Sequence, residues 1–446
     1  MDPMPVPRDF LLPMPAAQGD LELAIVVLFL AHILFVALML GGALLTLAAE
    51  LRGLSRPAYD RLAQKIAATV TVNKSLAVVL GVGPLLAINA LYGLYFYSAN
   101  ALTGRAWIML VPLIASAFLL LYIHKYSWHA LADRKGLHIA VGGAGTLLLL
   151  VVPLVFLSNI NLMLFPGRWL DVHGFLSALI LPNVLPRYLH FVLASLAIAA
   201  LFLAGWLCRR GFDFATELPG LDRCAVKREL LGVAMVATAA QLLAGPLVLL
   251  TLPPHGLTWQ LLGNLALAVS LAVTALILLW RESSLAEPLS PRFWIVVGLL
   301  AGTVGLMGLS RHLYREAALT PHRELVAAHT AAFEAASLGA EMRLAAGTPR
   351  LGPGEAVASP GERVFRATCM ACHDVETRRV GPPLREVAGI YAGNPSGLIA
   401  WVKAPGKKRP DYPQMPPITM QDAQYKAVAT YILDELFAPD DTAKEG

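Results

Sequence analysis

Charged residues are scarce in this chain of 446 residues: they make up 15% of it, whereas hydrophobic residues make up 57%. The mean hydropathy is +0.62. Soluble globular domains carry about a quarter charged residues, so the composition excludes an ordinary soluble protein. We therefore expect most of the chain to lie in a lipid bilayer.

Cysteine is equally rare, with four residues in the whole chain, and this excludes a disulfide-stapled scaffold. The sequence has no basic stripe and no nucleic-acid-binding motif, so we expect no nucleic acid partner. The opening MDPMPVPRDF also lacks the basic start of a signal peptide. We expect the first apolar stretch to be retained rather than cleaved.

Long apolar stretches dominate the first two thirds of the chain. A transmembrane helix needs about 20 mostly apolar residues. Eight stretches meet this requirement, at residues 22–49, 70–97, 106–128, 137–161, 186–208, 229–252, 258–280 and 293–315. The expected fold class is therefore all-α: a polytopic membrane bundle of about eight helices, followed by a soluble helical domain.

Basic residues are distributed unequally between the loops on the two sides of the bundle. One set of loops has only Arg8, Arg105, Arg168 and Arg187. The other set carries Arg52, Arg56, Arg61, Lys65, Lys125, Arg134, Lys135, Arg209, Arg210, Arg223, Lys227, Arg228, Arg281 and Arg292. Basic loops stay in the cytoplasm, so residues after 316 should lie in the periplasm. We expect a multi-pass protein of the inner (plasma) membrane.

The segment Cys369-Met370-Ala371-Cys372-His373 is a C-x-x-C-H motif, the attachment signal for c-type haem. Two thiols add to the two vinyl groups of one porphyrin, and the adjacent histidine meets the iron. A redox dithiol or half of a zinc site is the alternative for two such cysteines. The adjacent His373 and the outward location favour one covalent haem c on Cys369 and Cys372.

Two further motifs follow, Gly381-Pro382-Pro383-Leu384 and Tyr412-Pro413-Gln414-Met415-Pro416-Pro417, and a helix is predicted at 420–436. With them, residues 361–437 resemble class I cytochromes c. The resemblance implies that the proline carbonyl accepts a hydrogen bond from His373 and that Met415 is the second axial ligand. Met420 competes with Met415, but its place at the start of a helix favours packing.

A basic loop, Lys403-Ala404-Pro405-Gly406-Lys407-Lys408-Arg409, lies beside the expected haem. Such a loop can steer an acidic redox partner. A solvated loop without a partner is the alternative interpretation.

Histidines inside membrane spans are candidate functional residues, because burying an ionisable group in lipid is costly. His32, His190 and His312 lie toward the outer ends of the first, fifth and eighth predicted helices. His124, His129 and His138 lie near the inner face, where we expect roles at the edges of loops. The three outer histidines are therefore candidate ligands of b-type haem.

The stretch AHILFVALMLGG at 31–42 resembles the first helix of subunit I of the cytochrome bd quinol oxidases. LSNIN at 157–161, PRYLHFVLAS at 186–195 and GFDFA at 211–215 also resemble segments of that family, and the similarity spans residues 20–280. The resemblance implies that His190 binds a low-spin haem b and that His32 binds a second haem. His312 is a candidate partner of His190, with an interfacial position beside Arg311 and Arg315 as the alternative.

The sequence also departs from that family. The predicted third helix has no carboxylate, and Val111 and Leu119 stand near the places of the two glutamates that serve the oxygen site. The loop after the sixth helix is reduced to LPPHG, and the seventh helix has no methionine. The oxygen-reducing site is therefore expected to be dismantled.

These features predict a bundle at residues 1–316, a linker at 317–360 and a cytochrome c domain at 361–446. The expected function is electron transfer between one or two b haems or the quinol pool and a periplasmic c haem. A periplasmic redox protein, a second membrane subunit and quinone are the candidate partners. The alternatives are a divergent terminal oxidase or gas reductase fed by its own c haem, and a haem-free tether for the cytochrome. The sequence therefore leaves open whether the chain is an enzyme.

Overall fold

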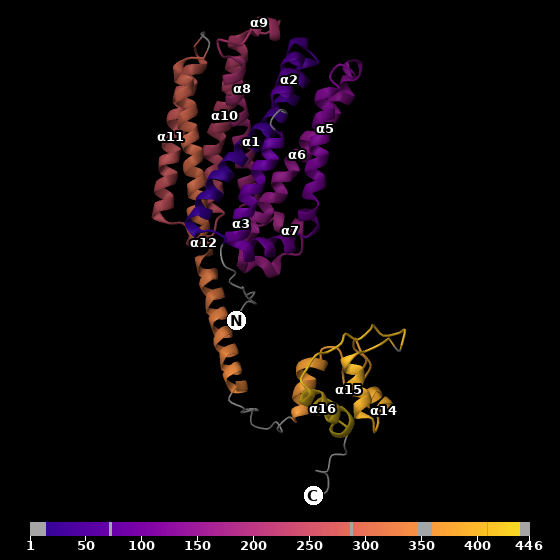
Figure 1. Cartoon of the computed structure of the whole chain (residues 1–446). Helices are drawn as coiled ribbons and strands as arrows, with labels where there is room; N and C mark the ends of the chain where they lie inside the picture. Colours follow the sequence, from indigo (N-terminus) through magenta and orange to yellow (C-terminus); the bar gives the residue numbers. More distant parts are fainter. Residues whose placement is uncertain (1–14, 71–73, 286–288, 346–358, 408, 438–446) are drawn as a thin grey trace. The chain divides into compact units, whose positions relative to one another are not determined.

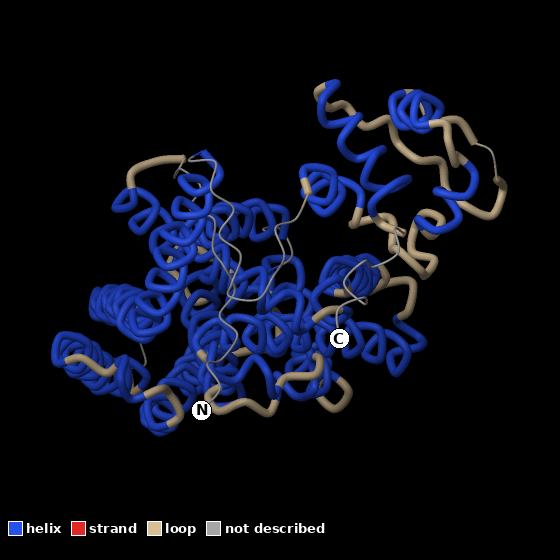
Figure 2. Tube along the Cα trace, turned by 90° about the horizontal axis from the view of Figure 1, so that it is seen from below, coloured by secondary structure: helices blue, strands red, loops and turns tan. Residues whose placement is uncertain are grey.

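The computed structural model describes residues 15–70, 74–285, 289–345, 359–407 and 409–437. Within these ranges the secondary structure is helical, with no strand (Figure 2). The chain divides into two compact units, Met1–Phe333 and Glu334–Gly446. The all-α expectation is confirmed for the described part of the chain.

The first unit holds eight helices long and apolar enough to cross a membrane, counted over the described residues. The number predicted from the sequence is thus confirmed. They lie in α1 (Gln18–Gly53), α3 (Lys74–Thr103), α4 with α5 (Arg105–Ile108, Leu110–Tyr126), α6 (Lys135–Leu164), α8 (Val184–Leu207), α10 (Arg223–Leu250), α11 (Trp259–Ser283) and α12 (Pro291–Ala345). The second span covers Val79–Thr103, later than the predicted 70–97, because the amphipathic helix α2 (Pro57–Val70) precedes it.

Helix α1 is the centre of the bundle and packs against α2, α3, α6 and α8. Gly41 allows its closest approach, because a Cβ there would lie 2.0 Å from the carbonyl oxygen of Ser195 in α8. Small residues let membrane helices pack backbone to backbone. The Gly41-Gly42 pair, quoted above for its resemblance to the bd oxidases, is thus explained by packing.

The two ends of the bundle are built differently (Figure 1). One end, the α9 end, carries the beginning of α2, the short η2 (Ala132–Arg134) and α9 (Phe214–Glu217). The opposite end, the α7 end, carries η3 (Pro166–Asp171), α7 (Phe175–Leu179) and η4 (Pro254–Gly256). Helix α12 continues beyond the α7 end.

Helix α12 is unbroken from Pro291 to Ala345. The part of the predicted linker up to residue 345 is therefore helical, and residues 346–358 of it lie outside the described residues. The limits 1–316, 317–360 and 361–446 stay a prediction.

The second unit contains α13 (Pro360–Val364), η5 (Phe365–Cys369), α14 (Leu384–Ile390), α15 (Pro395–Lys403), α16 (Asp422–Thr430) and η6 (Tyr431–Glu435). Its core gathers Phe365, Leu384, Leu398, Val428 and Ile432. Helices α13 and α16 cross at Gly361, where a Cβ would lie 2.2 Å from the carbonyl oxygen of Ala427. This crossing holds the first and last α-helices of the unit against each other. The C-x-x-C-H turn lies between these two helices in the sequence, directly after η5.

Candidate haem sites

The C-x-x-C-H motif forms a tight turn at the end of η5. The backbone N–H groups of Cys372 and His373 both donate to the carbonyl oxygen of Cys369, at 3.1 and 2.9 Å. Burial raises the pKa of the Cys369 thiol to about 11.

The imidazole of His373 is held in one orientation. Its Nδ1–H donates to the carbonyl oxygen of Pro382 at 2.9 Å, so the hydrogen bond that the resemblance implied is present. Gly381 lies against the ring, because a Cβ there would come within 2.3 Å of His373 Cε1. The bond occupies Nδ1 and leaves Nε2 as the metal-binding atom, as orienting partners of histidine ligands do.

Met415 lies in the loop between α15 and α16, and neighbouring residues fix that loop. The Ile418 N–H donates to the Val402 carbonyl at 3.2 Å, and the Tyr425 hydroxyl donates to the Ile418 carbonyl at 2.6 Å. Met415 itself is partly exposed. Met420 packs against the core of the unit, in agreement with the expectation that it packs.

The basic loop after α15 is partly neutralised by its own neighbours. Lys403 pairs with Asp422 at 2.9 Å, and Arg409 pairs with Asp411 at 2.8 Å and with Glu386. Lys408 lies outside the described residues. These pairs reduce the positive charge available to a partner, so the steering of an acidic protein stays a prediction.

In the bundle, His190 lies near the start of α8 at the α7 end and is partly buried. Its Nδ1 is buried and has no hydrogen-bond partner among the described residues. An unpartnered polar atom in an apolar interior is costly. Histidine ligands of haem iron bind through Nε2 and donate from Nδ1 to an orienting partner. Nδ1 of His190 has no such partner among the described residues, so haem binding at His190 stays a prediction.

His312 lies on α12 at the same end of the bundle. Its Nε2 is 3.8 Å from Glu22 Oε2, and its Nδ1 is buried without a partner in the described part of the chain. Val184 of α8 and Leu319 of α12 belong to one buried hydrophobic cluster. The segments that carry His190 and His312 are therefore neighbours.

His32 lies in α1 and faces α3. A Cβ on Gly81 would lie 2.9 Å from His32 Cε1, so a glycine makes room for the ring. The structure places His32 inside the helix packing, on elements other than those of His190 and His312.

The third span, which has no carboxylate, turns Val111 and Leu119 away from the interior of the bundle. Val111 and Leu119 are 75% and 63% exposed on α5, so these two positions face outward and not the bundle interior. The buried residues of α5 are Leu110, Ala117, Leu121 and His124. Val111 and Leu119, the counterparts of the two oxidase glutamates, thus lie on the outward face of α5. The inward face of α5 has no carboxylate either.

Loop-edge roles were expected for His124 and His138, and this expectation is wrong. Both are buried, at 3% and 0% exposure, and both contact Glu50, which is fully buried. His129 is exposed, as expected. Glu50 lies at the end of the first span, and His124 and His138 lie at the ends of the third and fourth spans. The alternation of the spans puts all three ends on the same side of the membrane, and this feature of the sequence could have predicted that the residues meet.

The two units of the chain are similar to different known proteins. The cytochrome c family matches residues 358–434. Cytochrome c-552 of Hydrogenobacter thermophilus is 38% identical over 68 residues, which is 15% of this chain and 69% of that protein. Cytochrome c-551 of Azotobacter vinelandii is 32% identical over 77 residues, 16% of this chain and 94% of the relative.

The bundle is similar to the structure of bd oxidase from Geobacillus thermodenitrificans, with a TM-score of 0.50 and 12% identity over 68% of this chain and 87% of that chain. This likeness shows the fold of the bundle. The whole is a multi-pass membrane protein that carries a c-type electron-transfer module. By its C-terminal residues the chain belongs to the cytochrome c family, which implies a covalently attached haem c.

Proposed function

We propose that this protein carries electrons between a b haem or quinol pool in the membrane bundle and a c haem in the periplasm. The observation that supports it best is the orientation of the His373 ring. The Nδ1–H of His373 donates to the Pro382 carbonyl, which would leave Nε2 for the haem iron.

In the C-terminal unit, Cys369 and Cys372 would attach the porphyrin, and His373 Nε2 and Met415 would be the axial ligands. The haem supplies one-electron redox chemistry when bound. Pro382 fixes the His373 ring and Gly381 gives it space. With Met415 as the second axial ligand, no position would be left for a gas, and this unit would exchange electrons.

In the bundle, His190 would bind a b haem, with His312 a candidate second ligand and His32 a candidate ligand of another haem. Arg315 supports a site at this end, because its side chain is 8% exposed and its Nη1 has no hydrogen-bond partner among the described residues. It would pair with a carboxylate of a haem. A buried cation needs such a counter-charge.

Loop charges support an orientation in which the α9 end faces the cytoplasm and the α7 end faces the periplasm. The c unit would then meet a soluble periplasmic redox protein. A second membrane subunit and quinol would approach the bundle from the lipid. This would be a component of a respiratory chain in the inner membrane.

Haem stoichiometry tests the proposal. On the purified full chain, pyridine haemochrome spectra should give one covalent haem c and one or two extractable haems b. His190→Ala should lose extractable haem and keep the covalent haem, whereas His173→Ala, which removes an exposed histidine from the same end, should keep both.

Two results would contradict it. A wild-type protein without extractable haem would favour the tether. A high-spin signal that shifts with carbon monoxide would favour the oxidase or gas reductase, against which the absence of carboxylates from α5 counts.

A further inference from the structure

At the α9 end of the bundle, far along α1 from His32, three ligand-type side chains meet in the interior. Glu50 ends α1, His124 ends α5, and His138 begins α6. Their candidate ligand atoms all lie within 4.8 Å of one another, and all three residues are buried. The proposed electron path uses none of them.

The imidazoles of His124 and His138 each contact a different oxygen of the Glu50 carboxylate. His124 Nε2 lies 2.7 Å from Glu50 Oε2, and His138 Nδ1 contacts Glu50 Oε1. On its other side, His138 Nε2 lies 2.8 Å from the carbonyl oxygen of His124, which can only accept, so this nitrogen carries a proton. A neutral His138 therefore turns the lone pair of Nδ1 toward a carboxylate, and a cation is needed there.

Lys135 is shared between two carboxylates at this site. Its Nζ lies 2.8 Å from Glu50 Oε1 and 2.6 Å from Asp60 Oδ1. Asp60 is 30% exposed and is solvated, whereas Glu50 is fully buried. The buried acceptors Glu50 Oε1 and His138 Nδ1 still require a cation between them, either a proton on the imidazole or a metal ion.

We propose that Glu50, His124 and His138 bind a divalent transition-metal ion of the zinc type. Two imidazoles and a carboxylate are a ligand set that zinc accepts. The bond from His138 Nε2–H to a carbonyl is the kind of outer contact that orients a histidine ligand. The ion would displace Lys135 from Glu50. The Lys135 side chain is 20% exposed, so it can turn toward solvent.

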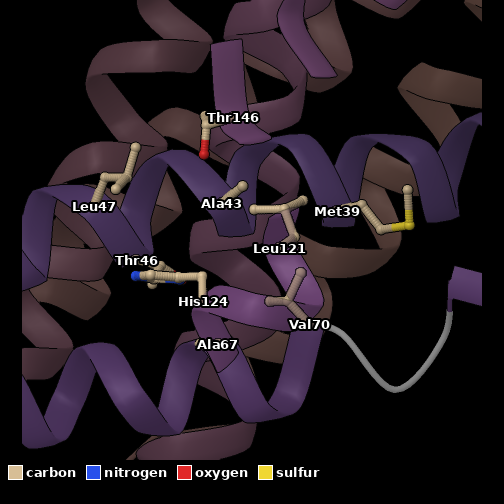
Figure 3. Close-up of a pocket in the computed structure, with 9 residues that line it drawn as sticks. All are labelled: Met39, Ala43, Thr46, Leu47, Ala67, Val70, Leu121, His124 and Thr146. Carbon is tan, nitrogen blue, oxygen red and sulfur yellow. The ribbon is translucent and has the colours of Figure 1, made fainter. Parts of the chain in front are cut away.

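The packing around the histidines is consistent with a built site. Gly142 stands one turn after His138, and a Cβ there would lie 2.7 Å from the His124 ring. A cavity of about 20 Å³ adjoins His124, lined by Thr46, Leu121 and Thr146 among others (Figure 3). The lining includes His124 but neither Glu50 nor His138, so this cavity lies beside the cluster and is not part of it. The ion would clamp α1 to α5 and α6.

The test counts zinc on the full chain. Protein stripped with a chelator is dialysed against Zn²⁺, and zinc is measured by mass spectrometry relative to covalent haem. We expect about one zinc per covalent haem. Glu50→Gln, His124→Ala and His138→Ala should each lose that zinc. His129→Ala removes an exposed histidine near the same end and should keep it.

Two measurements guard against a folding defect. Lys135→Ala removes the competitor for Glu50 and should bind zinc at least as tightly as the wild type. Cu²⁺ bound to the wild-type protein should show electron paramagnetic resonance splitting from two imidazole nitrogens, without any variant.

Equal zinc content in the wild type and Glu50→Gln, together with no two-nitrogen copper signal, would overturn the proposal and leave a proton as the missing cation. Haem stoichiometry is read separately, so either result leaves the proposed electron transfer standing or falling on its own.

Discussion

The histidines of this chain differ in the partners of their ring nitrogens. His373 has one nitrogen fixed by a backbone carbonyl, His190 has a buried nitrogen with no partner, and both nitrogens of His138 make contacts. A glycine beside the ring marks His373, His32 and His124.

Gly381→Ala tests the support of His373. The new Cβ would lie 2.3 Å from Cε1 of the ring, so the ring must shift and weaken its bond to the Pro382 carbonyl. A less basic imidazole stabilises ferric iron less, so the midpoint potential of haem c should rise, and the unit should lose about 1–3 kcal/mol of unfolding free energy.

Redox titration and denaturant unfolding of the full chain, followed at the covalent haem, measure both quantities. Gly389→Ala is the control, because nothing lies within 4 Å of its added Cβ. A wild-type potential in Gly381→Ala would show that the glycine does not position the ligand.

At the scale of elements, close crossings are decisive, and glycine permits them. Gly41 brings α1 against α8 and Gly361 brings α13 against α16. The predicted helices gave the elements but not their partners, because helical periodicity is a property of one helix, whereas a crossing depends on two.

Gly361→Val should open the crossing of α13 and α16. A Cβ already meets the Ala427 carbonyl at 2.2 Å, so the larger side chain should cost about 1–3 kcal/mol of unfolding free energy. Chemical denaturation monitored at the haem reports this, with Gly389→Val as the control in an open helical position. Equal midpoints for the two variants would contradict the packing role of Gly361.

The pair of Lys403 and Asp422 ties the end of α15 to the start of α16. The hydrogen bond from Lys403 lowers the pKa of the Asp422 carboxyl. Its stabilising contribution is present above the unfolded pKa of about 3.9 and is lost as the pH falls through the lower folded pKa.

Asp422→Asn should therefore reduce the acid sensitivity of the unit, and more so at low salt because the pair is exposed. The denaturation midpoint of the full chain, measured between neutral and acid pH, checks this. An unchanged pH profile at low salt would show that the pair contributes nothing.

For the whole molecule, the distribution of basic loops predicts a periplasmic c unit. Ser396→Cys lies on the surface of the C-terminal unit, and Ser284→Cys is exposed after α11 at the α9 end. In cells with a permeabilised outer membrane and a Cys224→Ser background, a membrane-impermeant maleimide should label position 396 and not 284. In detergent both positions should be labelled. Labelling of position 284 alone in the cells would show that the topology is the reverse of the predicted one.

Composition and one five-residue motif were enough to predict a helical membrane protein with a cytochrome c module. The length of an apolar run and the C-x-x-C-H spacing involve only residues close together in the sequence, so both can be recognised without knowledge of the fold. The Glu50, His124 and His138 cluster could not be predicted in this way. Its members lie on three helices, and only their packing shows that they share a site.

The sequence by itself determined the number of spans, the C-x-x-C-H motif and the loop charges that predict orientation, because each depends on neighbouring residues or on composition. The tertiary structure decided which histidines are buried, which ring nitrogens lack partners, and that Val111 and Leu119 face outward. Burial and pairing arise from contacts between helices distant in sequence, and no local pattern specifies them.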